Sequence, residues 1–357
     1  MRSEHETVLS RPAGRAWRLF SALSVSAITR PTALVLTVLA VGVVALLSLR
    51  IGSVEITTAD AFNALFHYNP DSYAETVVRT LRLPRTLIGL GIGAALAVAG
   101  AAMQAATRNP LADPSILGVN SGAAFAIVTA MSFGLLTQPA QMVWFAFAGG
   151  LAAAVVVYAV GSAGAGSASP AKLALAGVII TTLLGSWTTA LLLLDQQTLN
   201  DVRFWLAGSL AGRDLSMFLG VLPFLGLGIA GMLLLGHQLN VLSMGEDTAR
   251  SLGMHTGRMR ALVAALVVLM TGASVAVAGP VGFVGLAVPH LVRGLAGSDN
   301  RWVLLFSLFA GPLILLGADI AGRVVARPGE VQVGIVTALV GAPFLIALAR
   351  RRQGMEL

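Results

Sequence analysis

Residues 86–107 read TLIGLGIGAALAVAGAAMQAAT, a run without a charged side chain that decides the class of the fold. A helix of about 20 apolar residues is long enough to cross the hydrocarbon core of a bilayer. The rest of the chain has a similar character: of 357 residues, 56% are hydrophobic and 11% are charged, with a mean hydropathy of +0.84. Soluble domains have about a quarter of their residues charged. The sequence therefore predicts an all-α polytopic membrane protein.

Working outward from this run, nine further apolar stretches can be delimited. The ten predicted spans are 32–50, 86–107, 116–136, 140–161, 173–194, 216–236, 261–279, 281–297, 302–322 and 332–349. The stretch 281–297 is short, so nine spans is the competing number. With ten spans and the N-terminus inside, fifteen basic residues fall on the inner side and eight on the outer side, which follows the positive-inside rule. We therefore predict a cytoplasmic tail at 1–31, a ten-span domain at 32–350 and a cytoplasmic tail at 351–357.

The sequence contains an internal repeat at an offset of 179 residues. Residues 93–100 (GAALAVAG) match residues 272–279 (GASVAVAG) at six of eight positions. The same offset pairs Pro110 with Pro289 and Gly118 with Gly297. The two octets lie in predicted spans 2 and 7, which cross in opposite directions, and inverted repeats are a common plan in transporters. Spans 2–5 and 7–10 are therefore predicted to form an inverted repeat; the shared Gly/Ala composition of membrane helices is the alternative explanation.

Several function classes are disfavoured because the groups they need are missing from the sequence. There is no cysteine, and the one lysine, Lys172, is not part of a GxxxxGK[ST] motif, so the chain is not its own P-loop ATPase. The five histidines show no i, i+4 pair, and neither a metal site nor a bound cofactor is expected. Asp195 and Asp319 are the acidic residues closest to a span interior, and both are near predicted outer ends, which disfavours an ion-coupled secondary transporter. The net charge of +7 is explained by membrane topology, so no nucleic-acid partner is expected, and no cluster indicates a catalytic site.

The longest polar stretch between spans, 237–260, is predicted to lie in the cytoplasm. Within it, glycines bracket about two turns of predicted helix at 245–253 (GEDTARSLG). Glu246 and Asp247 stand at the N-terminal end of this helix, where its dipole favours acidic side chains, and the closing glycine suits a C-cap. With nothing of its own chain expected to cover it, this helix is predicted to dock on a partner. A helix lying on the membrane surface is the alternative.

Two further clusters stand out near span ends. Arg79, Arg82 and Arg85 lie on the predicted outer side, against the positive-inside trend, and ion pairs with an acidic external partner would explain them. Snorkelling side chains that anchor the span end are the alternative. The segments 108–122 and 279–290 contain prolines that break a helix, and we interpret both as packed structural loops.

These residues resemble a known family, the iron–siderophore and cobalamin importer permeases, which are the ten-span membrane subunits of binding-protein-dependent ABC importers. The resemblance runs from about residue 32 to residue 350, in the family's order and spacing. The matching strings are 81–86 (LRLPRT), 109–114 (NPLADP), 245–247 (GED), 279–290 (GPVGFVGLAVPH) and 318–320 (ADI).

The resemblance implies a set of partners. A second permease subunit, either an identical copy or a paralogue, would complete a central pathway, and two ATPase subunits that bind ATP and Mg²⁺ would dock from the cytoplasm. The segment that resembles the coupling helices of the family comprises Leu242, Gly245, Glu246, Asp247, Ala249, Arg250, Leu252 and Gly253. The arginines that match those contacting glutamates of an external substrate-binding protein are Arg82, Arg85 and Arg323. The span 173–194 and the last span would line the pathway, and 167–172 occupies the place of a gate loop although its residues depart from the family's pattern.

We therefore expect a multi-pass permease of the bacterial cytoplasmic (inner) membrane, with both termini cytoplasmic and in contact with membrane lipid. Its expected substrate is a ferric siderophore, moved inward by alternating access, and ATP hydrolysis is expected in the separate ATPase subunits. Cobalamin or haem import by the same family and ion-coupled secondary transport remain the alternatives, with a membrane-embedded enzyme as a third class.

Overall fold

The computed structural model describes residues 29–353 apart from 53–54, 137, 139 and 164–169, and these residues form helices and no strand. Ten apolar helices coincide one for one with the ten predicted stretches. They are α2 (Arg30–Arg50), α5 (Leu83–Thr107), α6 (Val119–Ser132), α7 (Gln141–Ser162), α8 (Pro170–Leu194), α10 (Leu215–Leu234), α13 (Thr256–Ala278), α14 (Val284–Ala296), α15 (Asn300–Val325) and α16 (Val333–Gln353). The prediction of an all-α polytopic membrane protein is confirmed. The N-terminal tail, except for its last residues, lies outside the described residues.

Not all of these helices are long enough to cross a bilayer as single straight elements. Seven have the length and composition to do so, with α5 counted together with the segment before it as Tyr73–Thr107. Of the other three apolar helices, α6 and α14 are short, with 14 and 13 residues, whereas α16 has 21 residues. The helix α14, which corresponds to the marginal stretch 281–297, has 13 residues and spans about 20 Å at 1.5 Å per residue. It begins late because Gly279 and Phe283 adopt positive φ angles of 73° and 69°, which interrupt helical geometry between α13 and α14.

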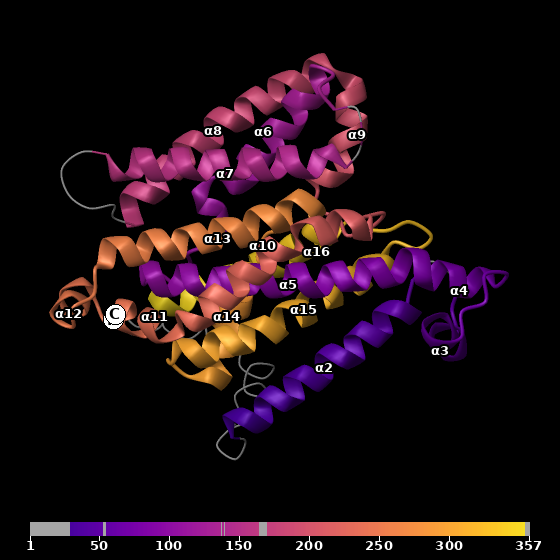
Figure 1. Ribbon diagram of the computed structural model, residues 1–357, viewed down its shortest axis with the longest axis horizontal. Helices are drawn as coiled ribbons and strands as arrows, with labels where there is room; N and C mark the ends of the chain where they lie inside the picture. The colour runs from indigo at the N-terminus through magenta and orange to yellow at the C-terminus, as the bar shows by residue number, and fades with distance from the viewer. Residues whose placement is uncertain (1–28, 53–54, 137, 139, 164–169, 354–357) are drawn as a thin grey trace, which may run out of the picture.

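Figure 1 shows how the helices are arranged. The helix α5 runs through the middle of the molecule with α13, α10 and α15 alongside it, while α6, α7 and α8 form a layer on one side and α2 lies on the other. The short helices gather at the two ends: α11 (Gly236–Ser243) and α12 (Glu246–Ser251) at one end, and α3 (Thr58–Phe66) and α4 (Tyr73–Val77) at the other. The remaining short elements are η2 (Val78–Arg82), η3 (Pro114–Leu117) and α9 (Gln196–Leu206). The helix α2 begins, and α16 ends, toward the end that carries α11 and α12.

The helix α5 is the buried centre of the fold because its small residues let other backbones approach closely. A Cβ atom added at Gly100 would lie 1.7 Å from the carbonyl oxygen of Gly285 in α14. One added at Gly93 would lie 2.7 Å from the nitrogen of Pro312 in α15. Small residues are typical of contacts between membrane helices, where close van der Waals packing replaces the hydrophobic driving force.

The substitution Gly100→Val is expected to lower the stability of the fold by about 1–3 kcal/mol or more, because the added atoms meet backbone that cannot rotate away. The measurement is the midpoint of thermal unfolding of the purified protein in detergent. The matched control is Gly226→Val in α10, where nothing lies within 4 Å of an added Cβ atom. Equal melting temperatures for the two variants would show that the α5–α14 contact is looser than described.

The offset of 179 residues does not hold along the whole repeat. The helices α5 and α13 run in opposite directions, as predicted for spans 2 and 7 (Figure 1). However, the octet 93–100 lies inside α5, whereas 272–279 ends α13, and Pro110 lies in a loop whereas Pro289 lies inside α14. The fixed offset fails because α5 continues for seven residues beyond its octet and is followed by a longer loop. The equivalence of Pro110 and Pro289 was therefore wrong, and the inverted repeat of spans 2–5 and 7–10 stays a prediction.

Candidate docking and coupling sites

The predicted coupling segment lies at one end of the molecule and consists of the end of α11 and the short helix α12, with a glycine on each side of α12. Gly245, with a φ of 119°, stands between α11 and α12, and Gly253, with a φ of 82°, follows α12. The amide of Met254 donates to the carbonyl of Ala249 (3.0 Å), and that of Gly253 donates to Arg250 (2.9 Å). This pair of bonds is a Schellman motif, in which glycine supplies the left-handed conformation. The predicted helix boundaries and the capping role of Gly253 are confirmed.

Glu246 attaches α12 to α13. Its Oε1 accepts hydrogen bonds from Arg250 (2.5 Å) and Thr256 (3.4 Å), and its Oε2 accepts one from Arg260 (3.2 Å). The Arg260 side chain is 13% exposed, so this ion pair is partly shielded from water, whereas Arg250 is 59% exposed. Glu246 therefore fixes the orientation of the short helix relative to the membrane-spanning helix that follows it.

Burial divides the predicted coupling residues into two groups. Ala249 is fully buried and Leu242 is 1% exposed, so both face their own chain. Leu252 is 62% exposed, and Asp247 is exposed with no ion pair among the described residues. The expectation that nothing of its own chain covers this helix was wrong, because the face of Ala249 packs inward. The surface open to a partner is carried by Asp247, Arg250 and Leu252.

The three predicted docking arginines come together at the opposite end of the molecule, where Arg85 and Arg323 form an ion-pair network with two acidic residues. Arg85 Nη2 and Arg323 Nη2 contact the carboxylate of Asp319 at 2.7 and 3.0 Å, and Asp319 is fully buried. Arg85 Nη1 also contacts Glu330 at 2.7 Å, in the turn between α15 and α16. Asp319 and Arg323 are four residues apart on α15 and so share one face.

Arg82 and Arg323 hold the end of α2. Arg82 Nη1 donates to the carbonyls of Leu49 (3.0 Å) and Arg50, and Arg323 Nη1 donates to those of Ser48 (2.9 Å) and Ile51 (2.8 Å). The last carbonyls of a helix lack partners within the helix and carry a partial negative charge, which arginine side chains satisfy and neutralise. The position of Gly52 is equally tight, since a Cβ atom there would lie 2.6 Å from Arg82 Nη2.

The burial of these arginines differs from the expectation that all three would be open to an acidic external partner. Arg82 is 6% exposed and Arg323 is 2% exposed, and both are committed to backbone carbonyls of their own chain. Arg85 keeps 11% exposure of its side chain. The arginines were expected at an open surface because their role inside the fold depends on α2 and α15, which are remote in sequence. Glu330 was missed entirely, since no local motif distinguishes it.

The other predicted features are structural. The segment 108–118 packs through η3, with Pro114 and Leu117 buried, and Gln104 Nε2 donates to the carbonyl of Leu286 across to α14. Asp195 caps α9 by accepting hydrogen bonds from Thr198, which hold the pKa of this carboxyl below its usual value. Among the described residues, no group of three or more histidine or acidic side chains could hold a metal ion. Most of the predicted gate loop lies outside the described residues.

The predicted pathway helix α8 is the least covered of the long helices. In the most apolar 18-residue stretch of α8, 11% of the residues are buried, against 83% in the corresponding stretch of Tyr73–Thr107, which includes α5. The hydroxyl-bearing residues Thr182, Ser186 and Thr189 are exposed on it, and the first two donate to carbonyls one turn earlier in the same helix. This face of α8 is therefore weakly polar, although these two hydroxyls are already bonded within the helix.

Comparisons with known proteins show which family the sequence matches. The model of the FecCD transport family matches residues 38–351. The chain is 42% identical to the Fe(3+)-citrate import system permease protein YfmD of Bacillus subtilis, over 87% of this chain and 92% of that one. It is 43% identical to the ferric enterobactin permease FepD of Escherichia coli, over 91% and 97%. It is also 40% identical to the cobalamin permease BtuC of Halobacterium salinarum, over 82% and 78%. A solved structure of a metal-chelate type ABC transporter in an inward-facing conformation superposes with a TM-score of 0.77 at 30% identity, covering 90% of this chain and 99% of that chain.

Proposed function

The chain belongs to the FecCD transport family and is a permease of a metal-chelate ABC importer, a multi-pass protein of the bacterial inner membrane, and we propose that its substrate is a ferric siderophore. The observation that carries the substrate proposal is the similarity, at 42% and 43% identity, to permeases named for ferric citrate and ferric enterobactin. Cobalamin is the second candidate because a cobalamin permease is 40% identical.

ATP hydrolysis takes place in separate subunits, and the coupling segment transmits it to the permease. Its exposed groups, Asp247, Arg250 and Leu252, contact the ATPase, while Glu246 holds α12 on α13. A movement of the ATPase would thus pass directly into α13, which packs against the central helix α5. Both termini are cytoplasmic in this arrangement, on the same side as α12.

The second permease subunit covers the exposed faces of α8 and α16. Both helices present apolar side chains to the outside, with Leu183 at 64% and Leu339 at 68% exposure, and α8 adds the hydroxyl-bearing stripe. Two such subunits enclose a pathway lined by small and weakly polar groups, which suits a substrate that must not be held tightly.

The external binding protein docks over the arginine cluster, and the members of this cluster differ in how far they are exposed to it. Arg85 and Glu330 are the more exposed members of the cluster. Arg82 and Arg323 are buried and bind the carbonyls at the end of α2. Arg327 is exposed in the same turn as Glu330, and it lines a cavity of about 840 Å³ with Arg50 and Glu55. Arg327 is therefore an exposed cation that is available to an acidic partner.

The substitution Arg327→Glu is expected to weaken binding of the cognate external binding protein about tenfold, and more strongly at low salt, because a rim charge acts on association. The melting temperature should stay unchanged, since the side chain is exposed. Arg323→Ala serves as the contrasting variant: it removes a buried group and should lower the melting temperature. Binding affinity measured by surface plasmon resonance, with melting curves beside it, separates the two roles; unaltered affinity for Arg327→Glu would contradict this docking surface.

The substrate proposal is tested by uptake in cells that carry the permease with its ATPase and binding protein. Radiolabelled ferric siderophores, cobalamin and haem are offered in parallel, and a permease-deleted strain provides the background. Permease-dependent uptake of a ferric siderophore is the expected result. Uptake of cobalamin or haem, with none of any iron chelate, would overturn the substrate proposal and leave the family assignment intact.

A further inference from the structure

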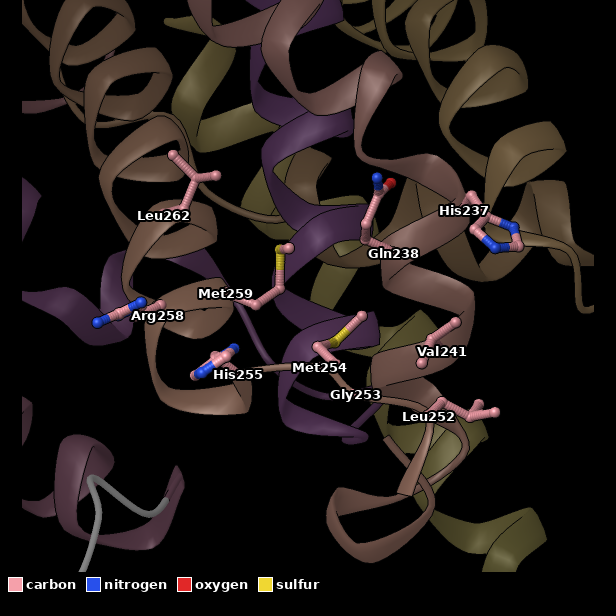
Figure 2. A pocket seen from close by; sticks show the side chains of 10 residues that line it. All are labelled: His237, Gln238, Val241, Leu252, Gly253, Met254, His255, Arg258, Met259 and Leu262. Carbon is pink, nitrogen blue, oxygen red and sulfur yellow. The ribbon is translucent and has the colours of Figure 1, made fainter. Parts of the chain in front are cut away.

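A pocket of about 610 Å³ opens beside the coupling segment, between α11 and the first turns of α13. Figure 2 shows Met254 and Met259 in the middle of it, between the two helices. Leu252 and Gly253 of the coupling segment line it at the end remote from Leu262. Methionine is flexible and polarisable, and it is frequent at surfaces that accommodate apolar ligands of varied shape.

The rim of this pocket is basic. His255 and Arg258 lie at one edge and His237 at the opposite edge (Figure 2), and none of the ten lining residues is acidic. All three basic residues are exposed, and their side chains have no hydrogen bond or ion pair within the described part of the chain. This separates Arg258 from its neighbours Arg250 and Arg260, both of which are paired with Glu246. Arg258 therefore gives the pocket a positive charge that no acidic side chain among the described residues neutralises by an ion pair.

The position of the pocket places this charge at the membrane surface. Arg258 lies in the first turn of α13, a helix long and apolar enough to span the membrane. Leu262 follows one turn later, about 6 Å deeper along the axis. The pocket thus changes from basic to apolar in the direction that a phospholipid changes from headgroup to acyl chain. Basic pockets between membrane helices on the cytoplasmic side are suited to anionic lipid headgroups.

Gln238 adds a polar group to the wall. Its Oε1 is buried and has no hydrogen-bond partner among the described residues. Figure 2 shows this amide at the level of Leu262, away from Arg258 and His255, so it belongs to the apolar end of the pocket.

We propose that this pocket binds an anionic phospholipid of the cytoplasmic leaflet. Its phosphate is held by Arg258 and His255, and the part of its acyl chains nearest the headgroup lies against Met259 and Leu262. The bound lipid fills the space between α11 and α13 next to Gly253, and so it supports the coupling segment from the membrane side. The proposal depends on the membrane embedding of the chain and not on which chelate is transported.

Native mass spectrometry of the delipidated protein, offered equal amounts of phosphatidylglycerol and phosphatidylethanolamine with the same acyl chains, tests the proposal. The wild-type protein should retain phosphatidylglycerol preferentially, and Arg258→Ala should reduce that preference about fivefold, the contribution of one basic residue near a membrane surface. Met259→Trp keeps the charge but fills the pocket, and it should reduce binding as well. The control Arg301→Ala removes another exposed arginine at the same end, 63% exposed and outside the pocket, and should leave the preference unchanged.

Equal preference in the wild type and Arg258→Ala, or an equal loss in Arg301→Ala, would overturn the proposal. Because the chain has no cysteine, Met259→Cys provides a single site for maleimide labelling. Phosphatidylglycerol, but not phosphatidylethanolamine, should slow this labelling at least severalfold. Protection by the assembled ATPase without any effect of phosphatidylglycerol would mean that a side chain of the ATPase occupies the pocket, and the lipid proposal would be wrong.

Discussion

Asp319→Asn is expected to destabilise the protein by about 3–5 kcal/mol, the cost of removing one partner from a buried ion pair. Asp319 is fully buried and compensates two arginines, Arg85 and Arg323, which are themselves 11% and 2% exposed. The asparagine keeps the shape but leaves two guanidinium groups with Glu330 as the one remaining acidic partner in the described network. The measurement is the melting temperature of the purified protein, together with its level in the membrane.

The matched control for this substitution is Asp201→Asn, which makes the same chemical change at an exposed position of α9. It should have little effect, as exposed substitutions usually do. A melting temperature of Asp319→Asn equal to that of the control would contradict a buried network and would restore an open docking role for Arg85 and Arg323.

Glu246→Ala is expected to reduce substrate uptake at least about tenfold, while the protein still reaches the membrane at normal levels. Among the described residues, the side-chain hydrogen bonds that join α12 to α13 are those that this carboxylate accepts from Thr256 and Arg260, while Arg250 binds it within α12. Without it, a contact with the ATPase at α12 would no longer move α13. Each such charge-assisted bond contributes about 1.5–3 kcal/mol when it is shielded from water and less when it is exposed. The readout is uptake per permease molecule, with ATP hydrolysis by the assembled complex measured in parallel.

Asp247→Ala distinguishes transmission from docking. Asp247 is exposed and has no ion pair within the described residues, so its loss should weaken association with the ATPase without loosening α12. Glu246→Ala should instead leave association largely intact and lower the ratio of transport to ATP hydrolysis. If Glu246→Ala left both uptake and that ratio unchanged, α12 would not be the coupling element.

Local patterns were sufficient to predict the helices and the shape of the coupling segment. The length of each apolar stretch was sufficient to locate each of the ten helices. Gly253 ends α12 because a residue in the left-handed conformation is needed where the amide of Met254 donates to the carbonyl of Ala249. These features depend on residues within one or two helical turns, so the sequence contains all the information that they need.

The burial of the arginines could not be predicted in the same way. Arg85 meets Asp319 across 234 positions of the chain, and Arg323 meets Ser48 across 275. Which side of α2 faces α15 is decided by the packing of several helices and leaves no periodic signal in either segment. The inward orientation of Ala249 depends in the same way on how α12 folds back on α13. The resemblance to a known family indicated which residues matter but not whether they are exposed.

The most direct test of the central claim, that this chain is the permease of an ATP-driven importer, is transport into proteoliposomes that contain the permease with its ATPase, with the binding protein added outside. Radiolabelled ferric siderophore should accumulate when ATP is enclosed, and omission of the ATPase, of ATP or of the binding protein should abolish accumulation. Accumulation in liposomes that contain the permease alone, driven by an ion gradient, would contradict this account and identify a secondary transporter.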